Sequence, residues 1–108
     1  MDLPIIDWEL SHKLAGNNSN HAKEFLELLN KELKKELPQL KKNLNNKAEL
    51  KKRLHKLHGA ISYSGLQRLK AAIIALENAL KNNEDVVILF KQFEFELKQV
   101  LEISPPLS

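Results

Sequence analysis

The chain has 108 residues, with 17 Lys and Arg against 14 Asp and Glu and a formal net charge of +3. This length supports one domain around one hydrophobic core, and 43% hydrophobic with 29% charged residues excludes a disordered chain. The lack of cysteine excludes disulfides, thiolate metal sites and cysteine nucleophiles. A pI of about 9.2 favours a partner with an acidic surface at least as readily as nucleic acid.

The N-terminal residues "MDLPIIDWEL" have no basic segment followed by an apolar run, so the sequence predicts no signal peptide. A short helix is expected over residues 7–15, stopped by Gly16. No stretch along the chain approaches 18 consecutive apolar residues, so we expect no membrane-spanning helix and no direct membrane contact.

Four longer helices are predicted from apolar residues that recur every three or four positions. The first begins after cap candidates at 17–20, ends at 43–46 and contains Pro38, which we expect to bend the helix or break it locally. The four apolar stripes are Ala22, Leu26, Leu29, Leu33, Leu37, Leu40 and Leu44; Leu50, Leu54, Leu57 and Ile61; Leu66, Leu69, Ile73, Leu76 and Leu80; and Val86, Phe90, Phe93, Leu97 and Leu101.

Amphipathic helices joined by short connections bury their stripes against one another, and neighbours then run antiparallel. We therefore expect an all-α fold, an antiparallel up-down four-helix bundle with a short additional N-terminal helix. Residues 1–103 are expected to form this single domain and residues 104–108 a C-terminal tail. A monomer is the default, because the bundle buries its own stripes.

The stretch "RLHKLHGAISYSGLQRL", residues 53–69, places a glycine directly after a pair of histidines in a predicted helix. At about 100° per residue, His55 lies roughly 130° from the centre of the apolar stripe and His58 roughly 70° from it. Gly59 follows His55 by one turn, so we expect it to remove a side chain that would lean over the imidazole ring. An imidazole exposed among cations suits a nucleophile for a phosphoryl group. The cations predicted around it are Lys51, Lys52, Arg53 and Lys56.

Other interpretations stay open at this level. A histidine among lysines is often only a solvated face, Gly59 also suits the close approach of a neighbouring helix, and Gly65 suits a helix C-cap. His55 and His58 are spaced for a shared metal or haem site, although bundle sites usually draw ligands from several helices and no Glu-x-x-His motif occurs. Nucleic-acid binding is not expected, because acidic residues interrupt most of the helices and aromatic residues are few.

The segment "HKLHGAISYSGLQRL" resembles the signature of histidine phosphotransfer (HPt) domains, H-x-[LI]-[KH]-G-x(4-5)-G, through His55, Leu57, His58, Gly59 and Gly65. With "DWELSHKLAGN" ahead of the long helix and "ELPQL" within it, the chain is most similar to the C-terminal HPt domain of BarA/GacS-type hybrid sensor kinases. The resemblance covers nearly the whole chain. It implies a reversible relay of a phosphoryl group in a two-component system.

The resemblance assigns roles to particular residues. His55 would accept the phosphoryl group from a receiver-domain phosphoaspartate and pass it to a response regulator. His58 stands where many family members carry lysine, and since a histidine is only partly charged near neutral pH, its help would depend on pH. Gly59 would give access to His55. Gln67 would donate a hydrogen bond from the start of the next helix, with Arg68 as its rival.

The implied partners are the receiver domains of a parent kinase and of a response regulator. Mg²⁺ would come with the receiver, because no carboxylate cluster is expected near His55, and this domain would bind no cofactor itself.

Without a kinase motif set the chain should not bind ATP. We expect a cytoplasmic relay domain, free-standing or part of a membrane-bound sensor kinase; a receiver-binding module that accepts no phosphate is the alternative. The expected partner-binding residues are Lys51, Lys52, Lys56, Ser62, Gly65 (which would also shape the turn into the next helix) and Arg68.

Overall fold

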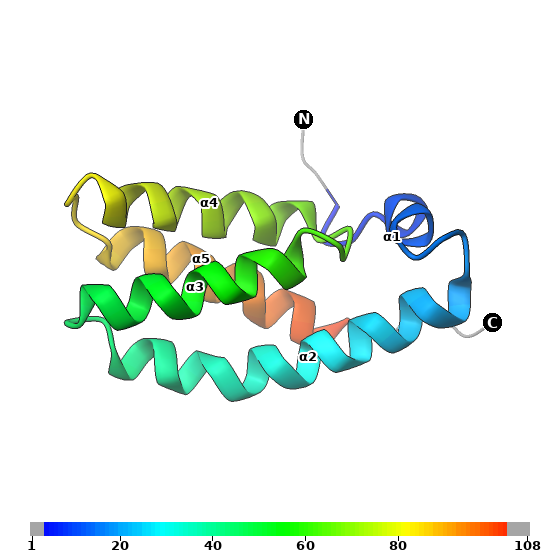
Figure 1. Ribbon diagram of the computed structural model, residues 1–108, viewed down its shortest axis with the longest axis horizontal. Coiled ribbons are helices and arrows are strands. Elements are labelled where there is room, and N and C mark those ends of the chain that lie inside the picture. The colour runs from blue at the N-terminus through cyan, green and yellow to red at the C-terminus, as the bar shows by residue number, and fades with distance from the viewer. Residues whose placement is uncertain (1–3, 104–108) are drawn as a thin grey trace.

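The computed structural model describes residues 4–103, and all the regular structure in that range is helical (Figure 1). The predicted all-α class is therefore confirmed. The helices are α1 (Trp8–Leu14), α2 (Ser19–Lys42), α3 (Lys47–Ile61), α4 (Gln67–Lys81) and α5 (Val87–Glu102). The predicted tail, residues 104–108, lies outside the described residues.

Side-chain caps begin the first three helices at the polar residues that the sequence offers. Asp7 accepts a hydrogen bond from the Leu10 amide at the start of α1, and Asn18 accepts from two amides at the start of α2. Asn46 accepts from the Glu49 amide at the start of α3. Each cap satisfies amides that the first turn of a helix leaves without a partner. α2 continues through Pro38 without a break, so the helix tolerates the missing amide hydrogen bond at this exposed position.

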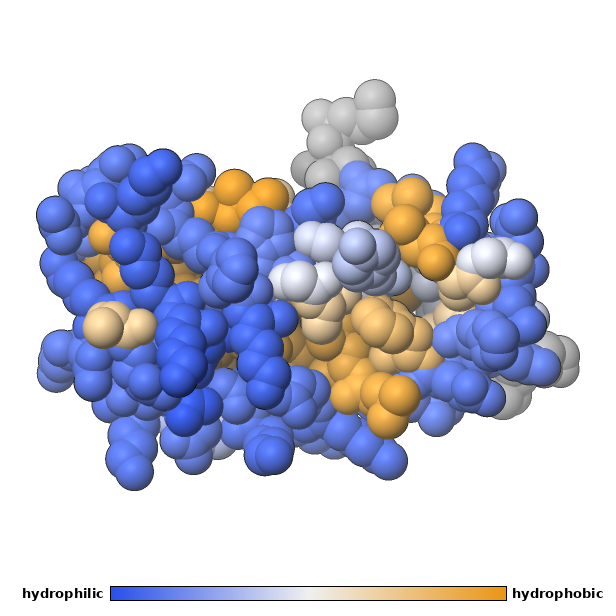
Figure 2. All heavy atoms as spheres, viewed as in Figure 1, coloured by the Kyte–Doolittle hydropathy of each residue, from blue (hydrophilic) through white to orange (hydrophobic). Residues whose placement is uncertain are grey.

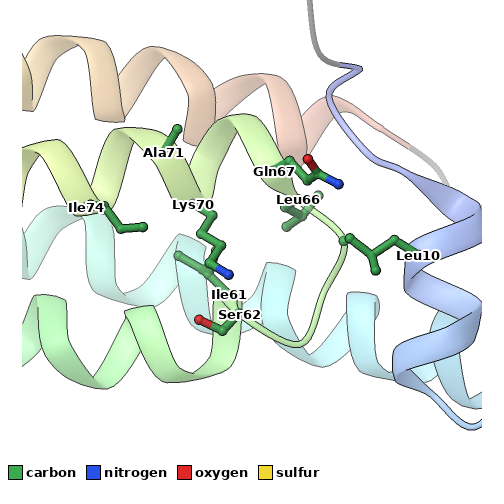
Figure 3. Close-up of a pocket in the computed structure, with 9 residues that line it drawn as sticks. Leu10, Ile61, Ser62, Leu66, Gln67, Lys70, Ala71 and Ile74 are labelled. Atoms are coloured by element: carbon green, nitrogen blue, oxygen red, sulfur yellow. The ribbon is translucent and has the colours of Figure 1, made fainter.

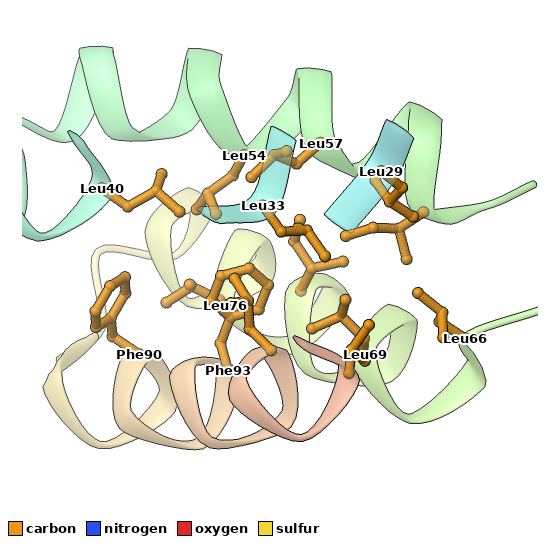
Figure 4. Close-up of a cluster of buried hydrophobic side chains, with 14 of the residues drawn as sticks. Leu29, Leu33, Leu40, Leu54, Leu57, Leu66, Leu69, Leu76, Phe90 and Phe93 are labelled. Atoms are coloured by element: carbon orange, nitrogen blue, oxygen red, sulfur yellow. The ribbon is translucent and has the colours of Figure 1, made fainter. Parts of the chain in front are cut away.

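The four long helices lie side by side, and each packs on two others (Figure 1). α3 contacts α2 and α4, while α5 also contacts α2 and α4, so the four contacts close a ring; α1 packs on the start of α2. The apolar stripes point into this ring and fill it with side chains such as Leu33, Leu54, Leu76 and Phe93, each fully buried (Figure 4). A ring of packed helices gives α3 one buried face and one face turned to solvent.

α1 is attached to the turn between α3 and α4 through the backbone. The Asp7 amide donates a hydrogen bond to the Gly65 carbonyl, with the two atoms 2.9 Å apart. Gly65 has φ +80°, and a Cβ there would lie 2.7 Å from the Asp7 carbonyl oxygen. Both the left-handed backbone and the close approach therefore require glycine at this position.

Candidate functional site

The exposed face of α3 carries His55. Its side chain is 87% exposed, whereas Leu54 and Leu57 beside it in the sequence are buried in the core. The predicted outward orientation of His55 is thus confirmed, because a regular helix that buries one stripe turns the residues between its stripe positions to solvent. The imidazole is held on a rigid element and is open to a partner.

His58, three residues further on, lies on the flank of α3 that faces α4. Its side chain is 30% exposed, and its Nδ1 lies 2.6 Å from Oε1 of Glu77 on α4. The second oxygen of the same carboxylate lies 4.0 Å from Nδ1 of His55. Two imidazoles from α3 therefore face one carboxylate from α4, and its side chain is itself mostly buried.

The carboxylate favours one arrangement of protons on the two rings. A carboxylate beside Nδ1 attracts a proton to that nitrogen, and in a neutral imidazole Nε2 then carries the free electron pair. For His58 the 2.6 Å separation is a strong hydrogen bond. For His55 the 4.0 Å separation is too long for a direct hydrogen bond, but it still places negative charge on the Nδ1 side of the ring. Nε2 of His55 is consequently the ring nitrogen suited to act as a nucleophile.

No pattern in the sequence singled out Glu77. It lies 19 residues after His58, on a different helix, and it reads there as an ordinary half-exposed position of α4. Glu77 is identified only by the contact between α3 and α4, and that contact depends on how far the two helices are rotated and shifted against each other. Helical periodicity within one segment does not contain that information.

Gly59 faces open space. A Cβ built on it would meet no atom within 4 Å, counting side chains of its own helix and every neighbouring element. The alternative that Gly59 admits a neighbouring helix is therefore excluded. The expectation that a side chain here would lean over His55 is also not met for a single methyl group. The space that glycine leaves lies outside the molecule, in front of the helix, where a partner would approach.

Gln67 and Arg68 are directed to other partners. Gln67 Nε2 lies 3.4 Å from the Asp7 carboxylate, at the attachment of α1. Arg68 donates to Glu96 on α5, with the atoms 2.8 Å apart. Both side chains thus connect α4 to elements other than the His55 face: Gln67 to the residue that caps α1, and Arg68 to α5. Gly65 is likewise buried in the turn before α4.

The cations predicted around His55 divide into two groups. Lys51, Lys52 and Lys56 are exposed on α3, on the same helix as the imidazole. Arg53 instead donates hydrogen bonds to Glu36 and Glu49, at 2.8 and 3.0 Å, and the bond that Glu36 accepts raises the pKa of the Arg53 guanidinium. Arg53 therefore ties α3 to α2 and does not belong to the free charge near His55. Ser62 stays close to the site, since its hydroxyl donates to the His58 carbonyl at 2.9 Å.

An apolar patch lies where α1, α2 and the residues after α3 meet. Leu28 and Tyr63 are each 65% exposed and Leu14 is 39% exposed, and Phe25 is partly buried beside them. Leu14, Phe25 and Tyr63 line a shared hollow of about 280 Å³. Figure 2 shows apolar side chains gathered in this part of the face, next to a polar half. We call Leu14, Phe25, Leu28 and Tyr63 the apolar patch.

Within residues 4–103, no three His, Asp or Glu side chains come together in a way that could hold a metal ion. No helix in the same range combines the length and apolar character needed to cross a bilayer.

A family model described as "Hpt domain" matches residues 22–103, from α2 to the end of α5. The chain belongs to the Hpt domain family, as the segment around His55 and Gly59 predicted. Domains of this family carry out histidine phosphotransfer in phosphorelays and interact with receiver domains. No curated protein and no solved structure gave a match to this chain.

Proposed function

We propose that His55 is the phosphoacceptor of this Hpt domain and that it relays a phosphoryl group between receiver-domain aspartates. One observation carries the proposal: the His55 imidazole is 87% exposed on a rigid helix while its Nδ1 faces the Glu77 carboxylate. His58 is close to the same carboxylate but keeps only 30% of its side chain exposed. Of the two rings, His55 is the one that a folded partner can reach.

The transfer follows from the orientation of the ring. The electron pair on Nε2 of His55 attacks the phosphorus of an aspartyl phosphate, so that an N–P bond forms as the P–O bond to the aspartate breaks. The aspartate leaves as a carboxylate with the electron pair of that bond. The proton on Nδ1 stays in place, and the phosphorylated ring carries a positive charge that the Glu77 carboxylate, 4.0 Å away, offsets. Passing the group to a second receiver reverses these steps.

The surface around His55 supports a docked receiver. Gly59 leaves open space in front of the helix, so the face of a partner can come close to the neighbouring imidazole. The exposed Lys51, Lys52 and Lys56 would attract the acidic pocket of a receiver and speed association. The apolar patch would supply contact area on one side. Mg²⁺ would arrive with the receiver, whose carboxylates hold it.

The proposal extends to the whole domain and its context. We take the four long helices as an antiparallel up-down bundle of one domain over residues 1–103, supported by their ring of contacts and by connections of only a few residues. We further propose a monomeric, cytoplasmic relay domain of a BarA/GacS-type hybrid sensor kinase. Its partners would be the receiver of that kinase and a response regulator.

The test uses a receiver domain phosphorylated on its aspartate with a labelled small-molecule donor and then mixed with this chain. Label should move to the chain in a form that is stable to alkali and lost in acid, as a phosphohistidine is. His55→Gln should abolish this label, whereas the matched change His12→Gln on α1 should leave it unchanged. Label that persists in the His55 variant would place the acceptor on another histidine. Tight receiver binding without any label would instead identify a docking module that accepts no phosphate.

A further inference from the structure

A groove runs along the seam between α3 and α4 (Figure 3), whereas the apolar patch lies where α1, α2 and the end of α3 meet. It has a volume of about 460 Å³, within the size range of pockets that take up a ligand or an anchoring side chain. Its walls come from the last turn of α3, the first two turns of α4 and Leu10 of α1. Three elements therefore form a preformed hollow.

The floor of the groove is apolar. Ile61 and Leu66 form its base at the edge of the core, and Ile74 stands in the wall with 36% of its surface exposed. An apolar side chain placed here would leave water without losing any hydrogen bond, which stabilises a complex by about 25 cal/mol for each Å² of apolar surface buried. The groove thus fits an apolar anchor.

The groove also holds one positive charge without a counter-charge. Figure 3 shows Lys70 reaching from α4 toward Ile61 and Ser62 on α3. Within residues 4–103, no carboxylate lies within ion-pairing distance of the Lys70 ammonium, whereas Arg53 and Arg68 on the same two helices are both paired. An ammonium that is partly buried over an apolar floor attracts a carboxylate more strongly than one in open water. The occupant should therefore be both apolar and acidic.

The groove continues into the candidate site. Ser62 lines the groove, and its hydroxyl bonds the carbonyl of His58. Ile74 lies one helical turn before Glu77, the residue that faces His55 and His58. A partner seated over His55 therefore has this groove directly along its edge, in the direction of α1.

We propose that the α3–α4 groove is a docking site for a helix of the receiver partner. That helix would carry an apolar side chain, which fills the groove, about one turn from a carboxylate, which pairs with Lys70. This inference rests on the proposed function, because it takes the receiver as the occupant. The receiver would then cover His55 and contact both the apolar patch and this groove. Receivers that lack the apolar and acidic pair would transfer slowly, so the groove selects among them.

Two variants test the two properties of the groove. Lys70→Glu reverses its charge, and Ala71→Trp fills it from an exposed position of α4 that lines it. The matched controls are Lys91→Glu and Gln92→Trp on α5, a helix that packs on α2 and α4. Each variant is first checked for wild-type helicity and thermal midpoint. Its rate of transfer from a phosphorylated receiver is then measured, beside its phosphorylation by phosphoramidate, which needs no receiver.

With a receiver that serves the wild-type chain, Lys70→Glu and Ala71→Trp should each lower kcat/KM by about tenfold or more, mainly through KM. Phosphoramidate should label both variants at the wild-type rate, and Lys70→Arg should restore transfer. Transfer within twofold of wild type in both groove variants would overturn the inference while leaving the proposed function intact. Absence of label from either donor in the wild-type chain would instead remove the proposed function.

Binding without chemistry gives an independent check. An unphosphorylated receiver added to ¹⁵N-labelled chain should shift the amide signals of Ala71 and Ile74 together with those around His55. Shifts confined to the apolar patch would overturn the groove as a docking site. Saturation of the groove by a small amphiphilic acid such as octanoate, with no change in receiver transfer, would assign it to a small molecule and overturn it equally.

Discussion

Glu77 of α4 and His58 of α3 form the shortest polar contact at the candidate site, with Oε1 and Nδ1 2.6 Å apart. The same kind of contact recurs around the bundle, since each neighbouring pair of long helices is joined by a carboxylate and a basic side chain. The other three contacts use lysine or arginine, and the one beside His55 uses an imidazole. The four contacts are Glu36–Arg53, Glu77–His58, Glu96–Arg68 and Glu94–Lys41.

Glu77→Gln should slow phosphotransfer at His55 by about tenfold to a hundredfold, because the amide keeps the shape but loses the negative charge facing the ring. If the role of Glu77 were purely structural, the variant would change the stability of the bundle without changing which nitrogen of the His58 imidazole carries the proton. Nitrogen-15 NMR of the imidazoles separates the two, since the Nδ1–H form of His58 should become less populated in the variant. Unchanged tautomer populations with an unchanged rate of phosphoramidate labelling would contradict the positioning role of Glu77.

His58→Ala should slow transfer without eliminating it, because the variant removes a neighbour of the phosphoryl site and leaves the nucleophile. The effect should be coupled to that of Glu77, since the two side chains share a hydrogen bond. In a double-mutant cycle, His58→Ala with Glu77→Gln should therefore cost less than the sum of the single changes. Strict additivity would show that the two side chains act independently.

The parts of this site that the sequence predicts are those fixed within one helix. The outward direction of His55 follows from the spacing of Leu50, Leu54 and Leu57, because helical periodicity is a local property. Glu77 was not predicted, and Gln67 was expected to donate a hydrogen bond from the start of α4, with Arg68 as its rival. Gln67 lies instead beside Asp7, because the rotation of α4 against α3 is set by packing of the whole bundle.

The same contrast between properties of one helix and contacts with distant residues applies to Gly59 and Gly65. Gly59 in a helix stood out because it costs stability, and that cost is a local property. What surrounds Gly59 and Gly65 is set by distant residues. The turn of Gly65 contacts Asp7, about 60 residues earlier, and the sequence contains no sign of that contact.

Gly59→Ala should raise the free energy of unfolding by about 0.5–1 kcal/mol, since a methyl group there meets nothing within 4 Å and alanine favours the helix. The same variant should slow transfer from a receiver, and Gly59→Leu should slow it further, because both occupy the space in front of the helix. Urea denaturation gives the first quantity and single-turnover transfer the second. A stabilised variant that transfers at the wild-type rate would show that the open space at Gly59 is not used by the partner.

Gly65→Ala should lower the free energy of unfolding by about 3 kcal/mol. The variant would place a side chain on a left-handed backbone, and its Cβ would lie 2.7 Å from the Asp7 carbonyl oxygen. Gly16 offers a matched control, because its φ is also positive, at +69°, but a Cβ there meets nothing within 4 Å. Gly16→Ala should cost only about 1 kcal/mol. Equal losses in urea denaturation would mean that the close approach of Gly65 to the Asp7 carbonyl adds no cost to the substitution.

Glu94 on α5 should make the bundle sensitive to acid. The hydrogen bond from the Lys41 ammonium lowers the pKa of the Glu94 carboxyl below its ordinary value, with Lys98 adding to the effect. A carboxyl whose pKa is lower in the folded than in the unfolded chain binds fewer protons when folded, so its contribution to stability is complete above the ordinary glutamate pKa of about 4.3. That contribution is lost as the pH falls through the lowered pKa, where the ion pair with Lys41 disappears.

Glu94→Gln should therefore lower stability at neutral pH and flatten the loss of stability between about pH 5 and pH 2. Urea denaturation at a series of pH values measures both effects, with Glu27→Gln at an exposed position as the control. If the free energy of unfolding falls with acid as steeply in Glu94→Gln as in the wild type, the α2–α5 ion pair does not contribute to stability.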